Sequence, residues 1–170
     1  YKGLDLLLDA WAQLRRAGRT EGRRLIVAGE FYAPREKYVR QIELLGLGDE
    51  VILHDFFVPD ADVKYYFSAA DTVVQPYKTA TQSGVTQIAY QFELPMIVTD
   101  VGGLPEIVPD GRVGYVCRPD AASVADALRR IYEGGTLARF RAAMHEEKRR
   151  FSWEEMCSRV TELYGLVAPK

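Results

Sequence analysis

Short apolar runs alternate along this chain with longer stretches in which apolar residues recur every three or four positions. The runs lack a clean alternation of apolar and polar residues, as is typical of strands covered on both faces. They predict five strands, at residues 25–28, 51–53, 72–75, 96–99 and 114–117. Strands separated by helices need crossover connections, which favour a parallel sheet with helices on both sides. We therefore expect one doubly wound, Rossmann-like domain with three α/β/α layers over residues 1–170.

Helical spacing fills the intervals between these strands. The apolar stripes run over Leu4–Leu14, Val39–Leu45, Val63–Ala70, Val85–Phe92 and Val124–Ile131, and the residues after about Leu137 are also predicted to be helical. Gly46 or Gly48 is the expected stop signal of the second helix. The chain opens directly on a helix, whereas a sheet of this kind normally begins with a strand. We therefore expect a first strand upstream of Tyr1.

The composition restricts the classes of function. The chain is 48 % hydrophobic and 27 % charged, as in ordinary globular domains. Its net charge of −2 argues against a generally basic nucleic-acid-binding surface. No apolar run reaches the roughly 18 residues of a membrane span, and Tyr1 does not open a signal peptide. Cys117 and Cys157 are too few for a disulfide framework or a metal site, so we expect reduced, mostly buried thiols in the cytoplasm.

Ligands of open parallel sheets bind beyond the carboxyl ends of the strands, which directs attention to the loops there. Gly29 follows the first predicted strand, where glycine permits a tight turn or a close backbone approach. The third strand leads through Thr81, Gln82, Ser83 and Gly84 into a helix. The free N–H groups and dipole at such a helix start suit a phosphate. A side-chain cap from Thr81 or Ser83 would explain the same residues without a ligand.

Other candidate residues carry weaker signals. Gly102 and Gly103 follow the fourth strand and predict a shaped loop with its own short helix. Asp60 and Asp62 fit N-capping and first-turn charge on a helix better than they fit a metal site. His54 is isolated and is expected to be a core histidine at a strand end. The glycine-rich phosphate loops of ATPases and nicotinamide enzymes are missing from the sequence.

Taken in order and spacing, several segments resemble the C-terminal domain of the retaining glycosyltransferases that assemble lipopolysaccharide, capsule and other bacterial glycans. They are Lys2–Ala10, Leu25–Gly29, Ala69–Pro76, Leu94–Val108, Asp110–Tyr115 and Phe151–Glu154, and the likeness extends to about Leu166. The resemblance implies the C-terminal half of a GT-B fold, whose N-terminal domain binds the acceptor. It also implies transfer of a hexose from a UDP-, GDP- or ADP-sugar to a glycan or a lipid-linked acceptor.

The resemblance further implies roles for particular residues. Lys2 matches the lysine of the family's Lys-Gly pair, which contacts the donor diphosphate, and is the expected catalytic cation; no metal or other cofactor is expected. Gly29, Phe57, Thr81, Gln82, Ser83, Gly84, Val85, Gly102 and Gly103 are expected to line the donor site, with the base near Phe57. The final helix, residues 152–167, is expected to cross to the N-terminal domain, through which the enzyme would associate with the inner face of the membrane.

Two positions depart from the family pattern. The family's two glutamates, eight positions apart, fall on Ala80 and Ile88, which cannot contact the sugar or the ribose as carboxylates do. Ile88 also completes the apolar stripe of its helix and is expected to pack inward. Gln82 and Gln87 are the candidates to replace part of the lost carboxylate contacts.

The loss of both carboxylates favours an alternative function as a non-catalytic partner or scaffold of an active transferase, although Lys2 and the glycine loops argue against it. A nucleotide-sugar epimerase or a flavodoxin-like receiver would fit the alternation of strands and helices, but the residues for their chemistry are not identifiable.

Overall fold

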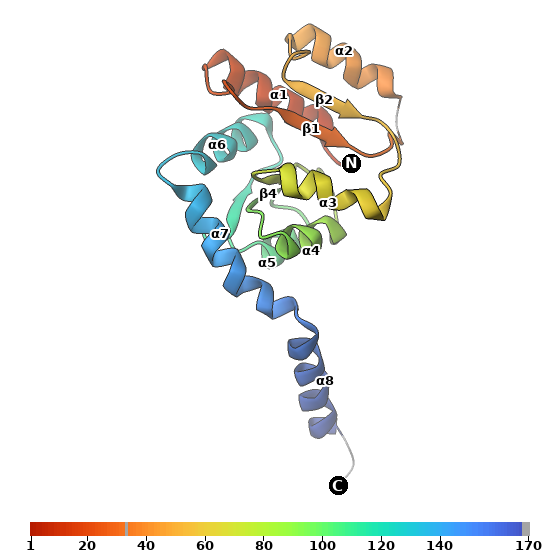
Figure 1. Ribbon diagram of the computed structural model, residues 1–170, viewed down its shortest axis with the longest axis vertical. Coiled ribbons are helices and arrows are strands. Elements are labelled where there is room, and N and C mark those ends of the chain that lie inside the picture. The colour runs from red at the N-terminus through yellow and green to blue at the C-terminus, as the bar shows by residue number, and fades with distance from the viewer. Residues whose placement is uncertain (33, 168–170) are drawn as a thin grey trace.

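All five strands expected from the sequence are present, each within one residue of the predicted bounds, and each is parallel to its neighbours. A computed structural model describes residues 1–32 and 34–167. In chain order the elements are α1 (Leu4–Arg16), β1 (Leu25–Ala28), α2 (Arg35–Leu45), β2 (Val51–His54), α3 (Asp60–Ala69), β3 (Val73–Gln75), α4 (Gly84–Gln91), β4 (Met96–Thr99), α5 (Leu104–Ile107), β5 (Gly114–Cys117), α6 (Ala121–Ile131), α7 (Thr136–Glu147), the 3-10 helix η1 (Lys148–Phe151) and α8 (Trp153–Val167). Figure 1 shows their arrangement.

The strands form two hydrogen-bonded groups and not one continuous sheet. β1 pairs with β2, and β3, β4 and β5 pair in that order. The N–H groups of Leu25 and Gly29 point to β2, where they bond the carbonyls of Glu50 and His54. Backbone groups of successive residues point to opposite sides of a strand, so those of Ile26 point away from β2. The described part of the chain offers no strand to pair with that edge.

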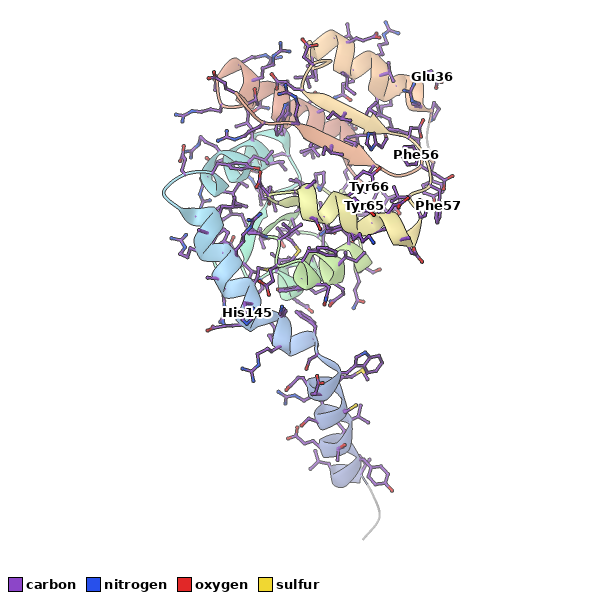
Figure 2. The ribbon with its side chains drawn as sticks, viewed as in Figure 1. Glu36, Phe56, Phe57, Tyr65, Tyr66 and His145 are labelled. Atoms are coloured by element: carbon purple, nitrogen blue, oxygen red, sulfur yellow. The ribbon has the colours of Figure 1, made fainter. Side chains whose placement is uncertain are left out.

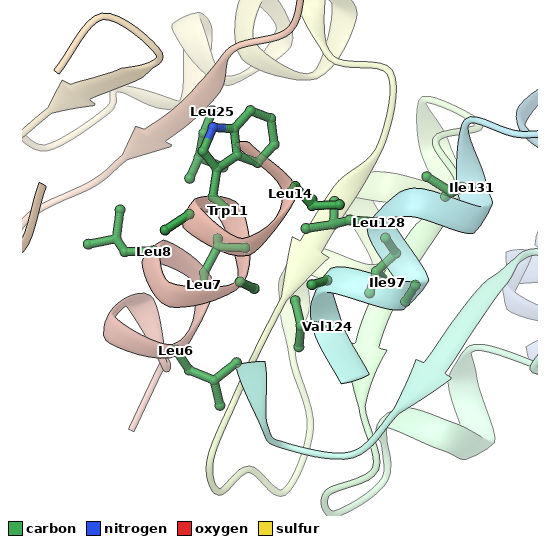
Figure 3. Packing of buried hydrophobic residues seen from close by; sticks show 14 of the residues in the cluster. Leu6, Leu7, Leu8, Trp11, Leu14, Leu25, Ile97, Val124, Leu128 and Ile131 are labelled. Carbon is green, nitrogen blue, oxygen red and sulfur yellow. The ribbon is translucent and has the colours of Figure 1, made fainter. Parts of the chain in front are cut away.

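One hydrophobic cluster nevertheless joins the two groups of strands into a single layer. Its apolar side chains come from α1 and α6 and from one face of every strand, including Leu25 of β1, Val51 of β2 and Ile97 of β4. Figure 3 shows α1 packed against α6, with Leu7 and Leu14 facing Val124 and Leu128. Burying each such side chain stabilises the fold by roughly 1.5–3 kcal/mol. The three-layer Rossmann-like architecture predicted from the sequence is therefore present, with a gap between the two strand groups.

The opposite face of β3, β4 and β5 is covered by a second cluster, in which α4 packs differently from our expectation. The buried residues of α4 are Thr86, Ala89 and Tyr90, whereas Val85 and Ile88 are only half-buried. Thr86 can turn inward because its hydroxyl donates to the Ser83 carbonyl at 2.5 Å. The Tyr90 hydroxyl likewise donates to the Ile107 carbonyl at 2.6 Å. These hydrogen bonds offset the usual cost of burying a polar group. The face of α4 that carries Thr86 and Tyr90 therefore turns inward, and the predicted inward packing of Ile88 is wrong.

The two C-terminal helices are packed very differently. On α7, Phe140 and Met144 are fully buried, and Glu147 is buried beside Arg112 and Arg150. No residue of α8 is buried, and the helix projects from the body of the domain with its side chains in the open (Figures 1 and 2). Ser152 begins α8 as predicted, accepting a hydrogen bond from the Glu155 N–H at 3.1 Å. The helix therefore does not fold back onto its own domain.

The two cysteines differ in exposure, because the elements that carry them are covered to different extents. Cys117 lies at the end of β5, and burial, with smaller contributions from Asp120 and Asp110, raises the pKa of its thiol to about 12. Cys157 lies on α8 and is exposed. The expectation of buried thiols is therefore wrong for Cys157, because the helix that carries it is uncovered.

Candidate functional site

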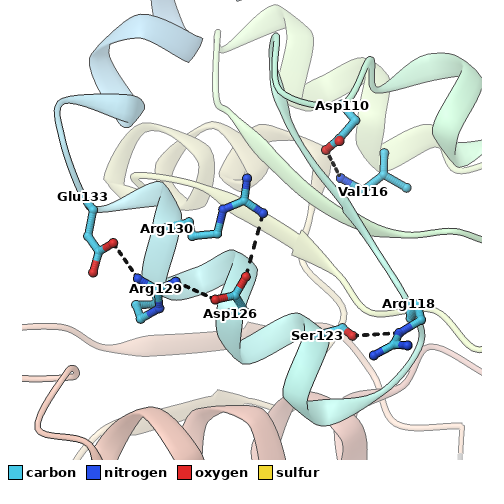
Figure 4. Close-up of polar contacts among 8 residues, drawn as sticks. All are labelled: Asp110, Val116, Arg118, Ser123, Asp126, Arg129, Arg130 and Glu133. Carbon is cyan, nitrogen blue, oxygen red and sulfur yellow. Dashed lines mark hydrogen bonds and ion pairs between the residues drawn. The ribbon is translucent and has the colours of Figure 1, made fainter.

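The start of α4 is an open helix N-terminus. Ser83 occupies the N-cap position, but its side chain makes no capping hydrogen bond. The start of α6 is different, because the Asp120 carboxylate accepts from the Ser123 N–H at 2.8 Å. The Ser123 hydroxyl oxygen also accepts from Arg118 Nε at 3.2 Å (Figure 4). The first turn of α6 is thus satisfied by its own side chains. The Thr86 N–H donates to the Ser83 carbonyl at 3.2 Å, but no described group bonds the N–H groups of Gly84 and Val85, which leaves them and the positive dipole end available for an anion.

Lys2 lies beside this helix start and is joined to it through Tyr77. The Lys2 Nζ donates to the Tyr77 hydroxyl at 2.9 Å and lies 4.1 Å from the centre of the Tyr77 ring. The same hydroxyl is 3.2 Å from Ser83 Oγ. The Tyr77 hydroxyl oxygen accepts the hydrogen bond from Lys2, which leaves the Tyr77 proton available for a hydrogen bond to Ser83 Oγ. The structure therefore brings Lys2 and the predicted phosphate loop together, although they are far apart in the sequence.

The charge on Lys2 is well maintained. Partial burial alone would lower the pKa of Lys2, but the hydrogen bond to Tyr77 and the nearby Tyr1 more than offset it, so the pKa lies above its ordinary value. The neighbouring Lys78 is already paired, because its Nζ lies 2.6 Å from the Asp5 carboxylate. Burial would raise the pKa of Asp5, but the hydrogen bonds from Lys78 and the Leu6 N–H hold it below its usual range. Lys2 is therefore the cation better placed to meet an anion here.

Glycines allow three backbone segments to meet at this point. Gly3 has φ of 72°, and a Cβ there would lie 1.9 Å from the Pro76 carbonyl oxygen. Gly102 has φ of 53°, and its Cβ would lie 1.9 Å from the Ala80 carbonyl oxygen. The Gly103 N–H donates to the Thr81 carbonyl at 2.8 Å. The predicted residues Gly102 and Gly103 thus support the loop from Ala80 to Gly84 from behind.

Within that loop the side chains divide into two groups. Thr81, Gln82 and Gly84 are exposed, whereas Ser83 is buried. Ala80 is half-buried and packs against the second hydrophobic cluster. Gln87 of α4 is exposed and lines a groove with Arg150 and Phe151. Gln82 and Gln87 are therefore accessible from solvent.

Gly29 and Phe57 lie at the ends of the other two strands and are not joined to this network by any hydrogen bond among the described residues. Gly29 has φ of 127°, and its N–H donates to the His54 carbonyl at 3.0 Å. Phe57 is 66 % exposed, in a loop with the exposed Phe56, close to α3 (Figure 2). Phe56 and Phe57 form an open aromatic surface beside β2.

Sequence reasoning missed Tyr77, the residue that connects the site. Its only signal was its place two residues after the third strand, because the contact with Lys2 spans 75 positions. Two smaller expectations need correction or refinement. Pro59 is the N-cap of α3, so Asp60 and Asp62 contribute first-turn charge without side-chain capping. His54 does end β2, but it is only half-buried, and its Nδ1 lies 2.8 Å from the Tyr66 hydroxyl.

Over the residues that the structure describes, no three histidine, cysteine, aspartate or glutamate side chains gather in a way that could hold a metal ion. Nor does any helix within residues 1–32 and 34–167 have the length and apolar character needed to cross a bilayer.

The sequence profile described as glycosyl transferases group 1 matches residues 1–134. The chain belongs to this family. A D-inositol 3-phosphate glycosyltransferase of Catenulispora acidiphila is 29 % identical over 171 residues, which cover 96 % of this chain and 41 % of that protein. The chain thus spans about two fifths of the length of the curated relatives it matches.

Solved structures of larger proteins contain the same fold. Sucrose-phosphate synthase from Thermosynechococcus elongatus superposes with a TM-score of 0.80 at 26 % identity, covering 98 % of this chain and 42 % of its own. HepE of Anabaena, solved in complex with UDP, also superposes with a TM-score of 0.80, at 23 % identity, covering 98 % of this chain and 46 % of its own. This glycosyltransferase chain therefore corresponds to one domain of larger, GT-B-type enzymes.

Proposed function

We propose that this chain is the donor-binding half of a retaining hexosyltransferase and holds the diphosphate of a nucleotide sugar between Lys2 and the start of α4. The N–H groups of Gly84 and Val85 carry the proposal, because the N-cap Ser83 makes no side-chain cap bond and shares the Tyr77 hydroxyl with Lys2, whose ammonium group has no carboxylate partner among the described residues. The UDP bound by HepE supports a nucleotide ligand of this class.

The chemistry follows from charge. Departure of the nucleoside diphosphate builds negative charge on its phosphate oxygens. The Lys2 ammonium and the α4 dipole, equivalent to about half an elementary charge, stabilise that charge more as it grows. Gln82 and Gln87 are exposed amides within two residues of Ala80 and Ile88, the positions of the missing carboxylates, and would offer hydrogen bonds to the sugar or ribose hydroxyls. The backbone around Phe57 would receive the base.

For the acceptor, we propose a glycan or lipid-linked saccharide held by an N-terminal domain in the cytoplasm, at the inner face of the membrane, in cell-surface polysaccharide or lipopolysaccharide synthesis. A second candidate is a small phosphorylated acceptor, favoured by the names of the D-inositol 3-phosphate glycosyltransferases among the relatives. In either case the 170-residue chain alone should not transfer sugar, because orientation of two substrates needs both binding sites.

We also propose that a further parallel strand fills the gap between β1 and β3, and that α8 packs on the N-terminal domain. The unpaired edge at Ile26 and the uncovered stripe of α8 support these two proposals. If the strand exists in a longer form of the protein, the Ile26 amide should exchange with solvent rapidly in this chain and slowly in that form. Equal exchange in both would contradict it.

The test of the donor site is a titration of the isotope-labelled chain with UDP, GDP and ADP, followed by NMR. At least one should shift the amides of Ser83 and Gly84. Lys2→Met should then lower the affinity about tenfold, as expected for loss of one charged hydrogen bond. Lys78→Met is the matched control, because Lys78 is already paired with Asp5. Shifts confined to other loops, or equal losses in both variants, would contradict the proposed site. A non-catalytic scaffold would bind none of the three nucleotides.

A further inference from the structure

Tyr77 is a buried side chain at the proposed donor site, and its backbone segment is held at two points. It is 6 % exposed. Its carbonyl accepts from the buried Thr99 hydroxyl of β4 at 2.6 Å. The next residue, Lys78, donates its N–H to the Tyr1 carbonyl at 2.8 Å, which ties the same segment to the chain beside Lys2. The Tyr77 hydroxyl therefore occupies a fixed point between the N-terminal segment and α4.

Lys2 has no comparable support of its own. It is exposed, and its four-carbon side chain samples many rotamers unless something holds the ammonium group. The Tyr77 hydroxyl and ring contact it at 2.9 Å and 4.1 Å from Nζ, and the Tyr1 ring lies farther away, at 5.1 Å. A fixed cation costs less conformational entropy when an anion binds than a mobile one does.

The hydroxyl also acts on Ser83. A serine at an N-cap ordinarily accepts a hydrogen bond from an N–H of the first turn, which would occupy a donor that an anion needs. Here the Ser83 Oγ is engaged by Tyr77 and makes no cap bond. One phenol group thus contacts both the cation and the N-cap side chain, which forms no bond to the first-turn N–H groups of α4.

We propose that Tyr77 is a positioning residue for the nucleoside diphosphate: it holds the Lys2 ammonium against the N-terminus of α4 and draws Ser83 away from capping that helix. This inference rests on the proposed function, since it concerns how the same diphosphate is bound. It assigns Tyr77 no contact with the reacting atoms.

A double-mutant cycle tests the proposal on the 170-residue chain, with whichever of UDP, GDP and ADP binds it most tightly. Tyr77→Phe should weaken binding about fivefold and Lys2→Met about tenfold. The double variant should lose clearly less than the roughly fiftyfold product, because only the effect of Tyr77 on Ser83 remains once Lys2 is gone. Tyr90→Phe is the matched control, because it also removes a buried tyrosine hydroxyl bond, to Ile107, without touching Lys2. It should leave nucleotide affinity unchanged.

Independent losses, giving about a fiftyfold effect in the double variant, would overturn the proposal, as would equal effects of Tyr77→Phe and Tyr90→Phe. A second readout needs no nucleotide. The side-chain ammonium of Lys2 should give a slowly exchanging NMR signal that disappears in Tyr77→Phe and persists in Tyr90→Phe. If no nucleotide binds the unaltered chain, the donor-site proposal fails, and an unchanged ammonium signal in Tyr77→Phe separately refutes the role of Tyr77.

Discussion

The two groups of strands in this domain differ in how completely neighbouring elements cover them. Every residue of β4, from Met96 to Thr99, is at most 1 % exposed, because helices cover both faces of that strand and β3 and β5 flank it. In the other group, Ile26 of β1 and Ile52 of β2 are 43 % and 40 % exposed. Both groups arise from apolar runs of similar length, so the difference lies in what surrounds each strand.

The same contrast holds at the carboxyl ends of the strands. Beside β3 and β4, close backbone contacts and the hydrogen bonds from Lys2 through Tyr77 to Ser83 hold the loops together. Beside β1 and β2, Gly29 and Phe57 lie in open loops. We infer that the first group positions the diphosphate through a rigid frame, whereas the second gains its order from ligands or neighbouring segments.

The largest expected effect compares isoleucines in the two groups. Ile97→Ala should lower the free energy of unfolding by about 4 kcal/mol, because it leaves a cavity in a strand covered on both faces. Ile26→Ala should cost less than about 1 kcal/mol, since its side chain is already half in water. Urea unfolding measures both, with Ile97→Val as a milder variant should the alanine fail to fold. Similar losses at the two positions would show that β1 is as well covered as β4.

The second prediction concerns Gly102, which supports the site from behind. Gly102→Ala should destabilise the chain by about 2 kcal/mol, because φ of 53° is unfavourable for alanine and its Cβ would overlap the Ala80 carbonyl. It should also weaken nucleotide binding by moving the loop that leads to Ser83. Gly48→Ala is the control, as a Cβ there meets nothing within 4 Å. If the two variants had equal stability and nucleotide affinity, the close contact would have no structural importance.

The third prediction concerns Phe57, in the exposed loop after β2. Phe57→Ala should leave the unfolding free energy nearly unchanged, since the ring is 66 % exposed. If the base lies there, UDP affinity should fall about fivefold, corresponding to loss of a stacking contact of about 1 kcal/mol. Pyrophosphate, which has no base, should bind both forms equally. A parallel loss for pyrophosphate would place Phe57 in the diphosphate site instead.

The sequence predicted the elements well and their surroundings less well. Buried strands such as Met96–Thr99 are continuous apolar runs, and periodicity finds them because burial on both faces leaves that pattern. The pattern does not reveal which strands lack a neighbour, so the gap beside Ile26 appears only in three dimensions. The burial of Thr86 could not be predicted for a related reason. Its hydroxyl donates to the Ser83 carbonyl, and the sequence does not show that this bond forms.

The candidate site was predictable only where its residues are contiguous. The loop from Ala80 to Gly84 and the pair Gly102–Gly103 stand out as small or polar residues after strands, and the structure brings them together. No role in the site could be assigned to Tyr77 from the sequence. An aromatic residue near a strand end is usually part of the hydrophobic core, and its partner Lys2 is remote in sequence. Contacts between distant segments depend on the packing of α1 against the sheet, which a single sequence does not specify.

The smallest expected effect concerns α8, the least covered part of the described chain. Ending the chain at Ser152 removes Trp153, Met156, Val160 and the rest of the helix, none of which is buried, but keeps the Phe151 ring on Tyr90. Because the domain loses no packing, its melting temperature should change by less than about 2 °C. Ending the chain before Thr136 is the contrasting control, because it deletes the buried Phe140 and Met144 of α7 and should unfold the domain. The exposed apolar stripe should also make the full chain more prone to self-association at high concentration, and light scattering should show that tendency fall on truncation. A large loss of stability on removing α8 alone would mean that the helix folds against its own domain in solution. It would then not be available to an N-terminal domain.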